Sequence, residues 1–352
     1  MTADQAAPDQ VPSLETAAGP SSAQAGLPAR GSRGRHAGPA IGPPGPTAQR
    51  AALTGRMRRT LAACRAYPLA TVGGALVVAM AVFCFLGPLV YHSNVTHVFF
   101  RQANLPPGTA HPLGTDGDGS DELGTLMAGG QMSLELGVAA GVLAAVLGSA
   151  WGAVAGYLGG VADAVMMRLV DAAIAIPAVV LLLLLISIYQ PSTAILVVVI
   201  AGTSWLSTAR LVRAEALTLR LREYVQAARV MGAGGPRIIV RHIAPNAVGT
   251  IVVNVSFQIA NAILVLATLS WLGLGVQYPS VDWGDMISAA DQTISDGYWW
   301  QILAPSVAII VVIAAFAMLG DGLRDVFAAA DYDDTPVAAG DVVRPAIDVG
   351  AR

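Results

Sequence analysis

Lysine is absent from this chain of 352 residues, so all of its 20 Lys/Arg positions are arginine. A nucleotide-binding P-loop needs a lysine that reaches the phosphates, and the chain therefore carries no such loop. Charged residues of all kinds make up only 12% of the chain, against about 25% in an ordinary soluble domain. Together with 55% hydrophobic residues and a mean hydropathy of +0.61, this composition predicts an integral membrane protein.

Cysteine and histidine are also scarce, which argues against disulfides and metal chemistry. The only two cysteines, Cys64 and Cys84, would lie about 30 Å apart along a helix and could not bridge each other. None of the five histidines has the HExxH spacing of a zinc site. An intramembrane enzyme would need converging ionisable groups, but Glu135 and Asp171 fall near the predicted membrane edges. We expect no metal, no bound cofactor and no catalytic residue in this chain.

Long apolar segments predict an all-α membrane protein with six spans, because about 20 apolar helical residues cross a bilayer. The third span contains Pro177, which removes one backbone hydrogen bond and is expected to kink it. The predicted spans are about residues 68–90, 132–157, a segment ending near 189, 194–212, 247–271 and 299–319.

The placement of arginine predicts the orientation, because cytoplasmic segments of membrane proteins are enriched in basic residues. Of the 20 arginines, only Arg101 falls on a predicted outer segment, so both termini are predicted to be cytoplasmic. Four tryptophans on the outer side fit an interfacial belt: Trp271, Trp283, Trp299 and Trp300. The predicted organisation is a disordered cytoplasmic tail (1–67) with juxtamembrane arginines, a first transmembrane helix (68–91), an external loop (92–131), a transmembrane core (132–330) and a second tail (331–352).

Four acids lie in the predicted external loop, and two interpretations of them stay open. Such carboxylates can bind a cation, or they can cap turns in a solvated loop. The acids are Asp116, Asp118, Asp121 and Glu122.

Glycines in the second span indicate close helix packing. They are spaced near one helix face and would let another helix approach closely, although the spacing does not identify that helix. Further along, Arg168 and Asp171 are three residues apart and close enough to pair. The glycines are Gly137, Gly141, Gly148, Gly152 and Gly156.

The loop 213–245 is the one long polar stretch between spans, and it is rich in arginine. Good helix formers from Ala214 to Met231 predict a helix, with Gly232 as its C-terminal cap. Pro236 is then placed to open a second short helix. One interpretation is a topology anchor that only holds this loop in the cytoplasm.

The same loop resembles the EAA coupling motif of ABC-importer permeases. Gln226-Ala227-Ala228 corresponds to the acidic-Ala-Ala triplet with glutamine in place of the acid, and Gly232 follows at the matching distance. Ile243-Ala244-Pro245 corresponds to the ending, one residue tighter. Further stretches resemble signatures of the dipeptide/oligopeptide (peptide/nickel) branch, in its C-type membrane subunit: HPLGTD at 111–116 with Gly119 and Asp121, residues 270–286, and LGDGLRD at 319–325. The resemblance covers about residues 68–330.

The resemblance implies a type I ABC-importer permease fold in a bacterial cytoplasmic membrane, and a role as permease subunit for di- or oligopeptides. It implies a heterodimer with a homologous permease subunit, two separate ATP-binding subunits that hold ATP and Mg, an extracytoplasmic substrate-binding protein, and no nucleic-acid partner. Two alternatives stay open: the same machinery imports nickel complexes or glutathione-like ligands, or the chain is a non-transporting membrane scaffold. The implied ATPase-coupling residues are Glu223, Tyr224, Gln226, Ala227, Ala228, Gly232, Ile243 and Pro245.

A polar stripe marks the fifth predicted span. Its members recur every three or four residues, which keeps them near one side of a helix, and amides in hydrocarbon need partners or water. Either the stripe hydrogen-bonds to a neighbouring helix, or Asn254, Gln258 and Asn261 line the translocation path. The full stripe is Asn246, Thr250, Asn254, Gln258 and Asn261.

Overall fold

The computed structural model describes residues 66–93, 100–188 and 192–333. Within these ranges the regular structure is helical, apart from one isolated β-bridge between Thr115 and Asp121. The two predicted tails fall almost wholly on residues outside these ranges, as does Cys64.

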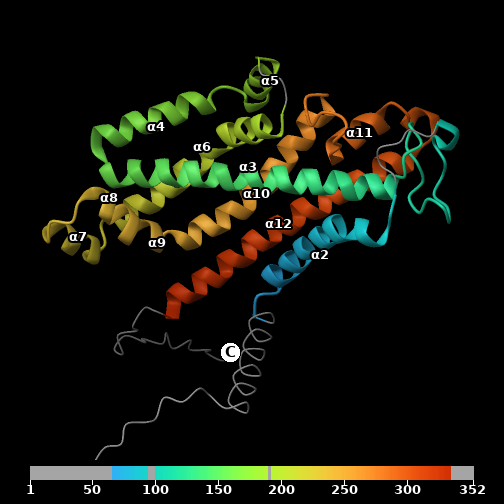
Figure 1. The fold of residues 1–352 in the computed structure, drawn as a ribbon. Helices are drawn as coiled ribbons and strands as arrows, with labels where there is room; N and C mark the ends of the chain where they lie inside the picture. The colour runs from blue at the N-terminus through green and yellow to red at the C-terminus, as the bar shows by residue number, and fades with distance from the viewer. Residues whose placement is uncertain (1–65, 94–99, 189–191, 334–352) are drawn as a thin grey trace, which may run out of the picture. The chain divides into compact units, whose positions relative to one another are not determined.

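Five helices in the described part of the chain are long and apolar enough to cross a membrane (Figure 1). They are α2 (Pro68–Val90), α3 (Glu122–Leu158), α6 (Thr193–Leu219), α10 (Val248–Trp271) and α12 (Trp299–Asp333). The predicted third span is two helices, α4 (Gly160–Ile174) and α5 (Ala178–Ile188), which meet at an angle of 81°. Proline cannot donate a backbone hydrogen bond, so Pro177 lies at a break between helices and not within a kinked one. The all-α membrane class is confirmed, with six spans if this bent pair counts as one.

The helix α3 begins ten residues earlier than predicted, at Glu122 and not Met132. Its start is set by Asp121, whose Oδ1 accepts a hydrogen bond from the backbone N–H of Gly124 at 2.9 Å. The other carboxylate oxygen of Asp121 accepts from the Tyr91 hydroxyl and contacts Nδ1 of His111, both at 2.8 Å. The predicted external loop therefore ends at this cap.

Turn capping accounts for a second loop acid. Oδ1 of Asp116 accepts hydrogen bonds from the backbone N–H groups of Asp118 and Ser120, at 3.0 and 2.7 Å. Across the described residues, no group of three or more histidine, cysteine, aspartate or glutamate side chains is arranged to hold a metal ion. The turn interpretation thus fits Asp116 and Asp121, although this loop is more buried than the predicted solvated one.

The glycine row of α3 packs against two helices. A Cβ built on Gly141 would lie 2.7 Å from the backbone N and Cα of Ile259 on α10. A Cβ on Gly152 would overlap the carbonyl oxygen of Ala209 on α6. The small residues therefore let α3 lie directly on both backbones, which confirms the predicted close packing and identifies the two partners.

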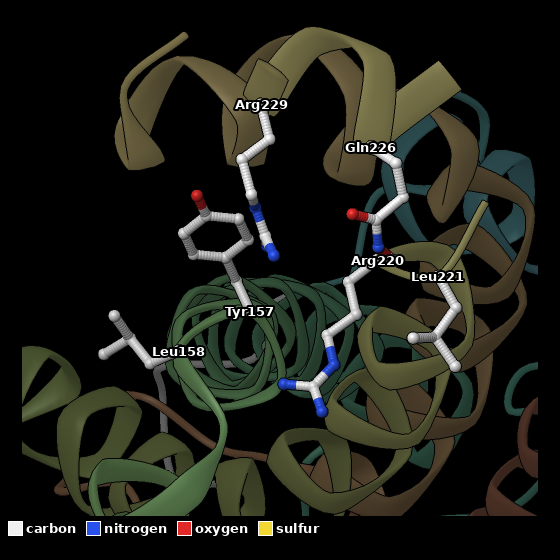
Figure 2. Close-up of a pocket in the computed structure, with 6 residues that line it drawn as sticks. All are labelled: Tyr157, Leu158, Arg220, Leu221, Gln226 and Arg229. Atoms are coloured by element: carbon white, nitrogen blue, oxygen red, sulfur yellow. The ribbon is translucent and has the colours of Figure 1, made fainter. Parts of the chain in front are cut away.

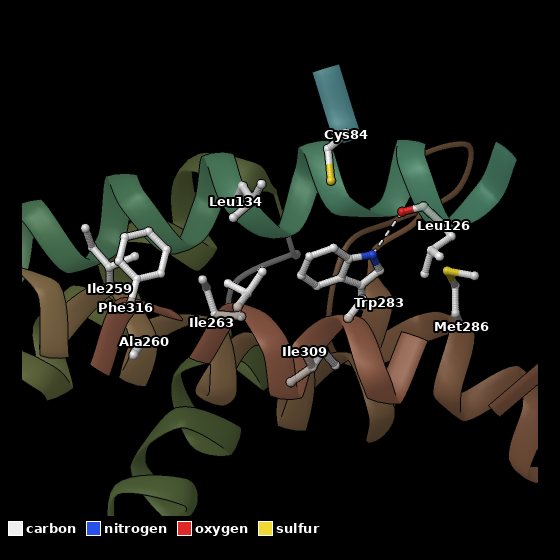
Figure 3. Packing of buried hydrophobic residues seen from close by; sticks show 12 residues of the cluster. Cys84, Leu126, Leu134, Ile259, Ala260, Ile263, Trp283, Met286, Ile309 and Phe316 are labelled. Carbon is white, nitrogen blue, oxygen red and sulfur yellow. Dashed lines mark hydrogen bonds between the residues drawn. The ribbon is translucent and has the colours of Figure 1, made fainter. Parts of the chain in front are cut away.

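The largest buried side chain, Trp283, opens the short helix α11 (Trp283–Asp291) and is 0% exposed. Figure 3 shows its indole Nε1 donating to the carbonyl oxygen of Leu126 on α3, at 2.9 Å. Asp282 caps this helix through the backbone N–H groups of Gly284 and Asp285, at 2.7 and 3.0 Å. The predicted place of Trp283 in an interfacial belt is therefore wrong, because α11 turns its first residue into the core.

Two ion pairs that the sequence did not predict fasten α4 to α6. Arg213 contacts both carboxylate oxygens of Asp163, at 2.5 and 2.6 Å. Asp171 pairs with Arg210 at 2.6 Å, and not with Arg168 as expected. The predicted Arg168–Asp171 pair is wrong because α6, distant in sequence, lies within reach of the same carboxylate. The signal that could have found these pairs is two acids and two arginines on neighbouring apolar spans.

Candidate functional site

The chain between α6 and α10 forms a cluster of short helices near the C-terminal end of α3 (Figure 1). They are α7 (Glu223–Val230), α8 (Gly235–Ile238), a π-helical turn (Ile239–Ile243) and α9 (Ala244–Asn246). The second short helix carries Pro236 in its first turn, as predicted. This cluster contains all eight predicted coupling residues.

The predicted helix from Ala214 to Met231 is interrupted between Leu219 and Glu223. Arg222 leaves the helical conformation, with φ −64° and ψ 143°. On one unbroken helix of about 3.6 residues per turn, Leu219 and Ala228 would point to opposite sides. The break allows both side chains to be buried. The prediction of a single helix was wrong because tertiary packing outweighs helix propensity here.

The buried face of α7 belongs to a small core of its own. Val225 packs with Leu219 of α6 and with Ile238 and Ile243 of the following turns, and Ala228 is buried on the same side. This core ties α7 to the end of α6 and to the start of α10.

The opposite face of α7 is exposed although it carries apolar side chains. Val230 is 88% exposed and Met231 is 81% exposed, and Tyr224 is exposed beside them. Large apolar side chains gathered outside any candidate span are typical of an interaction surface. We call Tyr224, Val230 and Met231 the exposed loop face. The predicted coupling residues Glu223, Gln226, Ala227, Gly232 and Pro245 are exposed as well.

Gly232 ends this helix in the left-handed conformation, with φ +83°. Its N–H donates to the carbonyl oxygen of Arg229 at 3.0 Å, and Ala233 N–H donates to Ala228 at 3.0 Å. A residue with a Cβ is strained in this conformation, whereas glycine is not. The predicted cap at Gly232 is therefore present, and it sets the direction in which the chain leaves α7.

A pocket lies between α7 and the end of α3, and two arginines enter it (Figure 2). The guanidinium of Arg229 lies 5.5 Å from the ring centre of Tyr157, a cation–π contact. Arg220 donates through Nη1 to the carbonyl oxygen of Gly156 at 3.2 Å, and Gln226 donates through Nε2 to the carbonyl oxygen of Arg220 at 3.1 Å. These contacts attach the coupling segment to the last turn of α3.

The polar stripe of α10 divides between two surroundings. Gln258 is only 4% exposed, and its Nε2 donates to the Ser204 carbonyl oxygen at 2.7 Å and to Thr208 Oγ1 at 2.6 Å, both on α6. Thr208 Oγ1 in turn donates to Asn254 Oδ1 at 2.7 Å. Asn261 is exposed, and among the described residues its side chain makes one long 3.4 Å contact, with Ser204 Oγ.

The stripe also borders a groove of about 630 Å³ between α6, α10 and α12. Thr250 and Asn254 line one part of it, and Glu215 and Arg324 bring charges of opposite sign to it. Arg324, within the 319–325 stretch singled out from the sequence, also lies 5.7 Å from the ring centre of Phe257. The sequence pattern placed neither Glu215 nor Arg324 at a site, because their helices meet α10 only in the folded chain.

Residues 148–330 match the family described as the binding-protein-dependent transport system inner membrane component. The chain belongs to this family. The matched part contains α4 to α11, including the short helices between α6 and α10 and the exposed loop face. The resemblance to ABC-importer permeases that the coupling motif indicated is thereby confirmed.

Individual members of the family are similar over most of their length. A Brucella suis biovar 1 protein that bears the name of a peptide permease is 39% identical over 260 residues, which cover 73% of this chain and 86% of that protein. The oligopeptide transport system permease protein OppC of Escherichia coli K12 is 38% identical, over 71% of this chain and 83% of OppC. The dipeptide transport system permease protein DppC of Bacillus subtilis is 35% identical, over 73% and 80%.

Proposed function

We propose that this chain is the permease subunit of an ATP-driven importer and forms, with a homologous subunit, the translocation path for di- or oligopeptides. The names of its relatives point to peptides as the cargo. The lack of lysine, and hence of a P-loop, supports placing ATP and Mg on two separate ATP-binding subunits. An extracytoplasmic binding protein delivers the substrate.

The observation that carries this proposal is the two-sided construction of α7. Val225 and Ala228 bury one side of the helix against the ends of α6 and α10, while Tyr224, Val230 and Met231 leave an apolar surface open on the other. A helix that is anchored within the subunit and apolar toward the outside suits a contact with a second, moving protein. A topology anchor would need the arginines but not this surface.

A charge at Val230 tests the coupling contact. Because Val230 is 88% exposed, Val230→Asp leaves the fold of the free subunit unchanged but places an unpaired carboxylate in the proposed interface. We expect the variant to reach the membrane in normal amounts, to lose co-purification of the ATP-binding subunits and to lose ATP-driven uptake of a labelled dipeptide or pentapeptide. Val230→Thr, which keeps the shape without the charge, serves as the control.

The outcome separates the competing functions. Normal co-purification and uptake in the Val230→Asp complex would defeat the coupling proposal. If the wild-type complex hydrolyses ATP but takes up only nickel complexes or glutathione, the substrate is one of these and not a peptide. A chain that never associates with ATP-binding subunits would fit a scaffold.

The orientation that follows from this proposal places both termini and α7 in the cytoplasm, in agreement with the arginine asymmetry. For the path, we propose that Asn254 and Asn261 face the route of the peptide, whereas Gln258 holds α10 to α6. The hydrogen bonds of Gln258 and the exposure of Asn261 support this division.

A further inference from the structure

At the end of α3 opposite α7 lies a further cavity, of about 380 Å³. The loop before α3 forms one wall, the first turn of α3 a second, and α11 a third. Tyr278, Val281 and Met286 add apolar surface. None of the coupling residues or stripe residues contributes to this cavity.

Four of the residues that line it carry carboxyl groups, and no arginine or histidine is among the lining residues. Asp116 and Asp118 come from the loop, Glu122 from α3 and Asp285 from α11. Burial raises the pKa of Asp116, and burial together with the nearby Asp282 charge raises the pKa of Asp285. Burial thus disfavours the charged form of these carboxyl groups, and no basic residue in the lining offsets this.

Glu122 is the decisive residue, because its burial is nearly complete and its carboxylate is unpaired. It is 2% exposed, yet its carboxylate makes no hydrogen bond or ion pair with any residue that the structure describes. Asp116 differs, since its carboxylate accepts backbone N–H groups. Burying a charged group without a partner is costly, so the ionised form of Glu122 is favoured only when a cation from outside the chain enters the cavity and pairs with it.

The arrangement favours an ammonium group over a metal ion or a guanidinium. The described residues contain no group of three acids or histidines set to hold a metal. A guanidinium is a planar fork that suits one carboxylate face, whereas an ammonium has three donors that can turn toward separate acceptors. Here the acceptors come from three segments, and the apolar part of the lining can hold the carbon chain beside the nitrogen.

We propose that the cavity around Glu122 binds a primary ammonium group, either the free amino end of the transported peptide or a lysine side chain of the binding protein. The first source rests on the proposed function; the second needs only a binding protein.

Zero-length coupling identifies the ammonium directly. A water-soluble carbodiimide activates accessible carboxyl groups, which then form amides with any primary amine that reaches them. A bound amine is therefore recognised by a yield that saturates as the amine concentration rises. The complete transporter, with its binding protein and trialanine, is treated and the peptides around Glu122 are analysed by mass spectrometry. We expect either an amide between Glu122 and trialanine whose yield saturates with trialanine concentration, or an amide between Glu122 and one lysine of the binding protein. Coupling of trialanine at the exposed Asp296 should instead rise in proportion to its concentration, and the same proportional rise at Glu122 would count against the ammonium site.

A matched pair of variants gives the functional arm. Glu122→Gln keeps the shape and removes a buried charge, so thermal unfolding should be unchanged or shifted upward. Loss of hydrogen bonds to a charged group should raise the half-saturating trialanine concentration about tenfold if the peptide is the source. If the binding protein is the source, stimulation of ATP hydrolysis should fall for every peptide. Asp296→Asn, outside the cavity, should match wild type.

Two results overturn the ammonium site: Glu122 uncoupled to any amine in the complete transporter, or Glu122→Gln with wild-type uptake and stimulation. Uptake by the wild-type complex is measured in parallel. Absence of peptide uptake there would defeat the proposed function, whereas normal uptake with an uncoupled Glu122 would defeat the ammonium site alone.

Discussion

Two glycines in the turn after α7 provide a matched test of coupling. Gly232 has φ +83° and Gly234 has φ −68°, and a Cβ built on either meets nothing within 4 Å. Alanine at Gly232 therefore introduces backbone strain without a clash, at a cost of about 1–2 kcal/mol. Alanine at Gly234 introduces neither. Any difference between the two variants reports the conformation of the chain and not the bulk of the side chain.

The strain should alter how α7 leaves its core. A penalty of about 1–2 kcal/mol changes the population of the native turn by about five- to thirtyfold. In the reconstituted transporter we expect Gly232→Ala to lower the number of peptides taken up per ATP hydrolysed, while Gly234→Ala keeps the wild-type ratio. The amount of subunit in the membrane should be normal for both, because the turn lies outside the spanning helices.

Equal ratios in both variants would refute this reasoning. If both equal wild type, the left-handed turn has no part in coupling. If both fall together, the loop is sensitive to any added side chain, and the conformation of Gly232 is not the reason.

The remaining predictions concern packing, path and orientation. Gly152→Ala, which meets the Ala209 carbonyl, should destabilise the detergent-solubilised subunit by about 1–3 kcal/mol, whereas Gly202→Ala, which meets nothing within 4 Å, should not; equal unfolding temperatures would contradict the packing of α3 on α6. Polar maleimide should label cysteine at the exposed Asn261 and leave cysteine at the buried Gln258 unlabelled; labelling only at Gln258 would reverse the proposed division of the stripe. A reporter fused after Gly235 should lie in the cytoplasm, and an external signal would reject the orientation.

Much of the fold could be predicted from the sequence because apolar length and glycine spacing act locally. The start and end of α10 fall within a residue of prediction, and the glycine row of α3 does pack closely. The cap at Gly232 was also predictable, since a left-handed helix end favours glycine whatever surrounds it. The family resemblance depended on short stretches of sequence in the same way.

Long-range contacts decided the rest. Asp171 pairs with Arg210 and not with Arg168 because α6 lies beside α4 only after folding. Tryptophan is typical of the membrane interface, but α11 places Trp283 in the core, where it donates a hydrogen bond to Leu126 of α3. The break before Glu223 arises because Leu219 and Val225, on either side of it, pack into one core. Helix propensity depends on local sequence and does not contain this contact.

The two candidate sites follow the same division. The sequence by itself determined which residues could couple and which could be polar within a span, because those are properties of residue type and spacing. Only the tertiary structure decided that Val230 stays open while Val225 is buried, and that Gln258 is satisfied by α6. It alone enclosed Glu122 without a partner, since burial and pairing depend on side chains that the fold brings from distant parts of the chain.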